Sequence, residues 1–170
     1  MSQLFSASTY TYTSTSTPRL AAVTATPPSG ADGSARAVRL LTELDHIRIS
    51  KLLMRPSSPL SAAAVGQIED VLQNAELVSS YDVPPSVVTM YSQVMIADRP
   101  SGQPRKLTIC YPSDAEPSTS FVSVFSPVGT SLLGLSVGQV AQWTGPDGKP
   151  ASAKILGVAF QPEESGDYLL

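Results

Sequence analysis

The stretch Ser123-Val124-Phe125-Ser126-Pro127-Val128-Gly129-Thr130-Ser131-Leu132-Leu133-Gly134 joins a short apolar run to a helix signal. Ser126 is a favourable N-cap, Pro127 suits the first helical turn, and Gly134 can end the helix. These residues therefore predict a short helix that follows a strand directly.

Alternating runs on both sides of this helix indicate strands. The runs at residues 92–97, 106–111 and 121–125 precede it, and those at 139–143 and 153–160 follow it. The last two flank Gly145-Pro146-Asp147-Gly148, which has the composition of a hairpin turn. We expect a twisted antiparallel sheet with one short helix, an α+β module over residues 83–170. The prolines within residues 82–90 predict a hinge at its start.

Residues 36–82 predict a short N-terminal helical hairpin. After an extended lead-in, Thr42 followed by Asp45 resembles a capping box, and Ser58 with Pro59 predicts the cap and first residue of a second helix. Two helices of about 12–18 residues joined by a short turn must pack antiparallel.

The apolar residues of both helices predict their buried faces. In the first helix one face is expected to combine Leu44, Ile47, Arg48, Lys51 and Leu52, and Ile49 and Leu53 flank it. In the second helix the apolar residues recur about every fourth position. They are Leu60, Ala64, Ile68, Val71, Leu72 and Ala75.

The first 35 residues differ in composition from the rest of the chain. They hold fourteen Ser and Thr but only two charged residues, Arg19 and Asp32. A segment with so little large apolar surface does not offset the entropy lost on ordering. We expect a disordered tail over residues 1–35, with a targeting peptide as the alternative.

The composition of the whole chain excludes several classes of protein. It has 170 residues, a formal net charge of −3, one cysteine and one histidine. A single cysteine and a single histidine exclude an internal disulfide and a Cys/His metal cluster. The charge gives no basic face for strong direct nucleic-acid binding, and no apolar stretch is long enough for a membrane span. We expect a soluble, cytoplasmic monomer.

No arrangement of residues in the sequence predicts an enzyme. His46 and Cys110 stand far apart in the chain, and Cys110 lies in an apolar strand, where a free cysteine behaves as a small hydrophobe. No glycine-rich phosphate loop is present. The carboxylates at 114 and 116 and at 163, 164 and 167 are typical of solvated loops. We therefore predict no catalytic residue, no cofactor and no metal.

The last 85 or so residues carry a specific resemblance. Thr108-Ile109-Cys110-Tyr111-Pro112 and the stretch from Ser123 to Gly134 are similar to the C-terminal domain of the Gre transcript-cleavage factors. Within that family, the ending from Phe160 to Tyr168 and Leu52-Leu53-Met54-Arg55-Pro56 resemble a branch of regulators of nucleoside diphosphate kinase.

The resemblance implies a fold and a partner. The implied fold is an FKBP-like domain joined to an antiparallel coiled coil, and the implied partner is RNA polymerase, bound at the rim of its secondary channel. The implied polymerase-docking loop and short helix comprise Phe125, Ser126, Pro127, Val128, Gly129, Leu132 and Leu133. Phe125 stands where Gre factors carry an acid.

The hairpin tip departs from the Gre pattern. Acidic residues at a Gre tip help to hold a catalytic magnesium, whereas the tip here has no carboxylate to bind a hard cation. It comprises Met54, Arg55, Pro56, Ser57 and Ser58. A helix of about 13 residues spans only about 20 Å, which is shorter than a Gre coil. We therefore expect a regulator that binds polymerase without stimulating transcript cleavage.

Two alternatives to this prediction remain. The resemblance also implies an effect on nucleoside diphosphate kinase, direct or indirect, although no residue pattern describes a kinase-binding surface. The FKBP-like fold brings a prolyl isomerase into consideration, on fold analogy alone.

Overall fold

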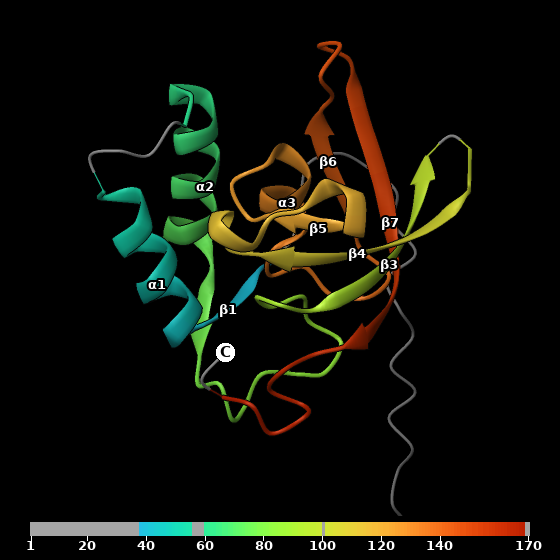
Figure 1. The fold of residues 1–170 in the computed structure, drawn as a ribbon. Coiled ribbons are helices and arrows are strands. Elements are labelled where there is room, and N and C mark those ends of the chain that lie inside the picture. The colour runs from blue at the N-terminus through green and yellow to red at the C-terminus, as the bar shows by residue number, and fades with distance from the viewer. Residues whose placement is uncertain (1–37, 56–59, 100, 169–170) are drawn as a thin grey trace, which may run out of the picture. The chain divides into compact units, whose positions relative to one another are not determined.

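The computed structural model describes residues 38–55, 60–99 and 101–168. The tail predicted over residues 1–35 lies outside these ranges. The C-terminal part is a five-stranded sheet in the order β5-β4-β3-β7-β6, which curls around the short helix α3 (Figure 1). The strands are β3 (Gln93–Arg99), β4 (Pro104–Cys110), β5 (Phe121–Ser123), β6 (Val140–Thr144) and β7 (Pro150–Phe160).

The five strands predicted along the chain are confirmed, but the sheet is not wholly antiparallel. β3 pairs antiparallel with β4 and β7, and β6 pairs antiparallel with β7. β5 pairs parallel with β4, from Thr108↔Phe121 to Cys110↔Ser123. Two 3₁₀ turns, at Pro112–Asp114 and Pro117–Thr119, carry the chain back before β5 begins. The connection is therefore a crossover and not a tight hairpin, so β5 runs in the same direction as β4.

The helix α3 (Pro127–Leu132) lies between β5 and β6 in the chain, as predicted. It packs against both of these strands and against α2. Gly134 follows it with φ +76°, a left-handed conformation that favours glycine after a helix. The helix therefore lies between the sheet and the N-terminal elements.

The N-terminal part contains two helices, α1 (Glu43–Leu53) and α2 (Ala62–Asn74), which lie side by side (Figure 1). A strand precedes α1 and another follows α2: β1 (Leu40–Thr42) and β2 (Glu76–Val78). These strands pair in parallel, and the two helices form the connection between them. Sequence analysis predicted only an extended lead-in before the first helix and did not predict this second sheet.

The predicted start of the second helix is wrong. Ser61 is the N-cap of α2, because its Oγ accepts a hydrogen bond from the backbone N–H of Ala64 at 3.2 Å. The predicted cap, Ser58, and the rest of residues 56–59 lie outside the described residues. The buried face of α2 is confirmed at Ile68, Val71 and Leu72.

The face predicted for the first helix is only partly confirmed, since Leu52 and the flanking Leu53 pack against the core. The buried residues of α1 are Asp45 and Ile49, whereas Ile47 is 48% exposed. Thr42 caps the helix as predicted, since its Oγ1 accepts the N–H of Asp45. The Asp45 carboxylate, however, accepts the backbone N–H of Met90, so an acid occupies the inward position that the pattern assigned to apolar residues.

In the segment predicted as a hinge, residues 87–90 are buried. Val87 and Val88 are buried, and Val88 donates its N–H to the carbonyl of Leu135. The core is continuous: it contains Leu41, Ile49 and Ile68 from the N-terminal elements together with residues of the sheet. None of the helices in the described ranges is long and apolar enough to cross a membrane.

The C-terminal segment 161–168 holds this part of the core in place. Gln161 donates its side-chain N–H groups to the carbonyls of Pro84 and Val87, at 3.0 and 2.9 Å. The Glu163 carboxylate accepts the hydroxyl of Thr89 at 2.7 Å. The rings of Tyr81 and Tyr168 also pack together, with their centroids 4.2 Å apart and their planes tilted by 40°.

Candidate docking surface

The turn into α3 is fixed by hydrogen bonds of Ser126. Its hydroxyl donates to the carbonyl of Ser123 at 2.7 Å and accepts the backbone N–H of Gly129 at 3.0 Å. A Cβ on Gly129 would lie 2.1 Å from the Ser123 carbonyl oxygen, which leaves no room for a side chain. The serine and the glycine together hold the loop at one conformation and leave Pro127 exposed at its outer end.

The other end of α3 is held by a residue that sequence analysis missed. The Arg39 guanidinium donates to the carbonyls of Thr130, Ser131 and Leu133, the last through a short contact. A cation at the C-terminus of a helix satisfies free carbonyls and opposes the helix dipole. Because Arg39 directly precedes β1, this contact joins the N-terminal elements to the base of the candidate docking loop. No local pattern around Arg39 could have revealed it.

The residues predicted for docking fall into two groups in the structure. Pro127 is exposed, and Ser126 and Val128 are partly exposed, so these three can contact a partner. The other four are buried and shape the turn from within. They are Phe125, Gly129, Leu132 and Leu133.

A groove of about 460 Å³ adjoins this turn. Its walls come from β4, from β5 and from the first turn of α3. Phe121, Val122 and Val128 supply apolar surface, while Arg105 and Lys106 supply positive charge. The groove is not predictable from a local pattern, because the parallel β4–β5 pairing brings together residues that are distant in the sequence.

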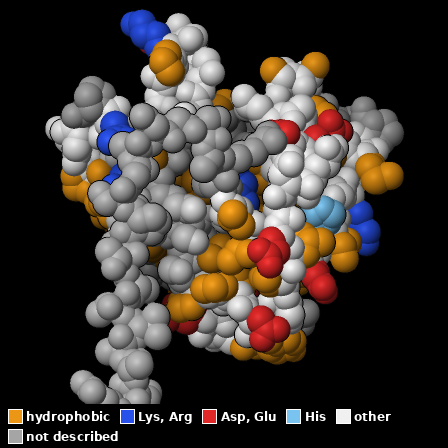
Figure 2. Space-filling model, turned by 180° about the vertical axis from the view of Figure 1, so that it is seen from behind, with side chains coloured by type: hydrophobic (Ala, Val, Ile, Leu, Met, Phe, Trp, Pro, Cys, Tyr) orange, Lys and Arg blue, Asp and Glu red, His pale blue; other side chains and the backbone are white. Residues whose placement is uncertain are grey.

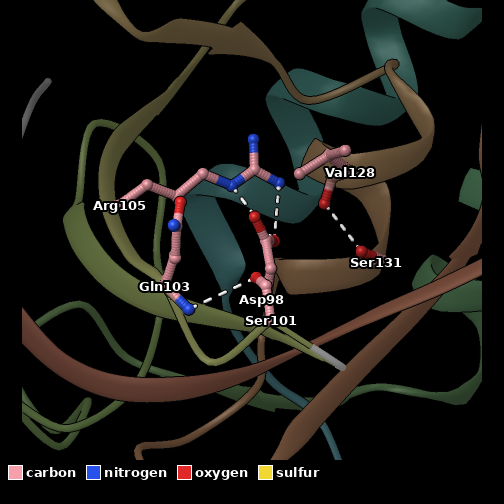
Figure 3. A network of polar contacts seen from close by, with 6 residues as sticks. All are labelled: Asp98, Ser101, Gln103, Arg105, Val128 and Ser131. Carbon is pink, nitrogen blue, oxygen red and sulfur yellow. Dashed lines mark hydrogen bonds and ion pairs between the residues drawn. The ribbon is translucent and has the colours of Figure 1, made fainter.

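One cation of the groove is held in place by an acid. Arg105 donates its Nε–H to Asp98 at 3.2 Å, and a terminal nitrogen lies 3.2 Å from the same oxygen. Figure 3 shows the Arg105 side chain extended toward Val128, with Asp98 beneath its guanidinium. Asp98 lies on β3 and Arg105 on β4, so the turn between these strands positions the charge.

The hairpin tip is described only in part. Met54 is 82% exposed and Arg55 is exposed. Pro56, Ser57 and Ser58, the other residues predicted there, lie outside the described residues.

A second groove, of about 310 Å³, runs between α1 and α2 and is lined in part by His46, Met54 and Glu69.

His46 and Cys110 lie in different surroundings in the structure. Cys110 is a free, fully buried thiol on β4, and burial raises its pKa. His46 lines the groove between α1 and α2, and the residues lining that groove do not include Cys110. Among the described residues, no cluster of His, Cys, Asp and Glu is arranged to hold a metal ion.

Not all of the carboxylates that were predicted to lie in solvent are exposed in the structure. Glu163 is only partly exposed, and burial raises its pKa although the Thr89 hydroxyl opposes that shift. Asp114 is exposed and accepts the hydroxyl of Tyr91 in a short contact. Glu163 is therefore part of the packed structure, because the C-terminal segment that bears it packs on residues 84–89.

Comparison with known proteins assigns the C-terminal part to a class. Residues 83–160 match the family model described as "Transcription elongation factor, GreA/GreB, C-term". Over 84 residues the chain is 37% identical to the transcription elongation factor GreA of Flavobacterium johnsoniae, which corresponds to 49% of this chain and 53% of that protein. The α3 turn and its sheet thus form a Gre-type C-terminal domain.

Another relative extends the similarity over most of the chain. The regulator of nucleoside diphosphate kinase of Escherichia coli K12 is 34% identical over 139 residues, 80% of this chain and 99% of that protein. A solved GreA/GreB structure from Nitrosomonas europaea is 33% identical with a TM-score of 0.60; the match covers 74% of this chain and 100% of that one. The chain belongs to the GreA/GreB family, in the branch of the regulator of nucleoside diphosphate kinase.

Proposed function

We propose that this protein is a non-enzymatic regulator that binds RNA polymerase near the secondary channel and does not stimulate transcript cleavage. Membership of the GreA/GreB family supports a role like that of a transcription factor. The observation that carries the proposal is the turn at Ser126–Val128, which is exposed at its outer end and fixed by its own hydrogen bonds. In this proposal the sheet is an FKBP-like docking domain.

The dimensions and chemistry of the hairpin support the absence of cleavage stimulation. We take α1 and α2 as a shortened coiled coil. With 11 residues, α1 is about 16 Å long. The tip sequence from Met54 to Ser58 has no carboxylate. Proteins usually bind magnesium through one or two carboxylates, and the tip supplies none.

The distribution of charge favours a protein partner over nucleic acid. Residues 60–92 contain no lysine or arginine but four acids: Glu69, Asp70, Glu76 and Asp82. Figure 2 shows acidic side chains interspersed with hydrophobic ones on the rear face of the molecule. A phosphate backbone is bound by clustered cations, whereas the lysine and arginine side chains that Figure 2 draws among the described residues lie in separate places.

Two measurements with purified components test the proposal. Binding to RNA polymerase is measured for the wild-type protein and for Pro127→Glu, which changes an exposed position without touching the core. We expect the wild type to bind and Pro127→Glu to bind at least about tenfold more weakly. Backtracked elongation complexes are then incubated with the protein alone. Cleavage of their RNA, or failure of the wild type to bind polymerase, would overturn the proposal.

A second function is favoured by the name of one relative. The Escherichia coli protein that aligns over 99% of its length is called a regulator of nucleoside diphosphate kinase. We infer an effect on that kinase, either on its activity or on its level. A kinase assay with and without the purified protein separates the two: a changed rate indicates direct action, and an unchanged rate excludes it.

A further inference from the structure

The groove beside the α3 turn combines apolar surface with positive charge. Phe121 and Val122 of β5 and Val128 of α3 form its apolar part. Arg105 and Lys106 are its charged residues, and the described residues that line it include no carboxylate. Charged groups across an interface are generally complementary in sign. A segment that occupies this groove would therefore carry acidic side chains next to apolar ones.

The Arg105 side chain is oriented by Asp98 and keeps hydrogen-bond donors available for such a segment. Its side chain is 46% exposed, and Asp98 holds the guanidinium through two contacts at 3.2 Å. A guanidinium has five N–H donors in a planar fork, so donors remain after Asp98 is satisfied. In Figure 3 one terminal nitrogen of Arg105 points away from Asp98 and has no dashed line to it. Fixing the side chain in advance reduces the entropy lost when a partner binds.

We propose that the groove binds an acidic, apolar segment of the partner protein, with a carboxylate on Arg105 and an apolar side chain on Val122 and Val128. The inference rests on the proposed function for the identity of the partner, RNA polymerase. The groove adjoins the exposed turn, since Ser126 and Val128 belong to both. One bound segment can therefore contact the turn and the groove together.

A charge-reversal pair tests the electrostatic part. Arg105→Glu/Lys106→Glu reverses the charge of the groove, while Lys149→Glu/Lys154→Glu makes the same change at exposed positions on the β6–β7 hairpin. We expect the groove variant to bind RNA polymerase at least about tenfold more weakly and the control to bind like the wild type. Equal losses in both variants, or no loss in the groove variant, would overturn the inference.

A crosslink identifies the bound segment. A photo-crosslinking amino acid replaces Lys106, which is exposed and lines the groove while leaving Arg105 in place. After irradiation with RNA polymerase, mass spectrometry maps the attached peptide, which we expect to contain Asp or Glu beside apolar residues. A basic or uncharged peptide overturns the inference while the proposed function stands. If the unmodified wild type does not bind polymerase, the proposed function fails and this inference fails with it.

Discussion

The carboxylate of Asp45 accepts the backbone N–H of Met90 at 3.2 Å, across 45 residues of chain. Asp45 lies on α1 and is 2% exposed, while Met90 lies three residues before the start of β3 and belongs to the core. The contact therefore joins the helical hairpin to the sheet. Burial of the acid raises its pKa to about 6, although the N–H of Met90 opposes the shift.

Stability should depend on the titration of Asp45. The folded-state pKa of about 6 exceeds the model-peptide value of 3.8, so the folded protein binds more protons than the unfolded chain between these values. The contribution of Asp45 to the free energy of unfolding therefore falls by roughly 3 kcal/mol as the pH rises from about 4 to about 6. Chemical denaturation of the wild type and Asp45→Asn across this range measures it.

The asparagine variant isolates this effect from other groups. Arg48, the Thr42 hydroxyl and Glu163 all act on Asp45, and the Asn variant retains them. Its amide oxygen can still accept the N–H of Met90. We expect Asp45→Asn to be at least as stable as the wild type above pH 7 and to lose that advantage as the pH falls. A difference that does not change with pH would contradict the prediction.

Gly129→Ala should severely destabilise the protein. The added Cβ would lie 2.1 Å from the backbone oxygen of Ser123, so the turn into α3 must move. We expect a loss of more than about 3 kcal/mol in the free energy of unfolding, measured by urea denaturation. Gly66→Ala is the matched control, because nothing lies within 4 Å of its Cβ on α2, and it should gain about 0.5–1 kcal/mol. Similar effects in both variants would show that the turn accommodates the methyl group.

Replacing Arg39 should loosen α3 specifically. Arg39→Ala leaves the carbonyls of Thr130, Ser131 and Leu133 without this donor, which should cost about 1–3 kcal/mol. Amide hydrogen exchange is the appropriate measurement, since we expect faster exchange in α3 than in β3 and β7. Arg99→Ala, at an exposed position, serves as the control. Uniform acceleration over the whole chain would indicate global unfolding instead.

Local signals explain what could be predicted from the sequence. The cap at Ser126, the proline at 127 and the glycine at 134 lie within nine residues, so α3 and its turn could be placed correctly. Asp45 and Arg39 act through contacts with residues 45 and more than 90 positions away, which no local pattern records. The groove was missed for the same reason: its walls meet only because β5 pairs parallel with β4.

Adding acids to the hairpin tip should not create transcript-cleavage activity. Met54→Asp/Arg55→Glu places two carboxylates at exposed tip positions, where they could bind a hard cation. The length of the hairpin remains limiting, because α1 is only about 16 Å long and the substitutions do not lengthen it. We therefore expect backtracked complexes to stay uncleaved, while the polymerase binding proposed for the α3 turn is unchanged. Cleavage by this variant would show that the missing acids alone, and not the length of the hairpin, keep the protein from acting as a cleavage factor.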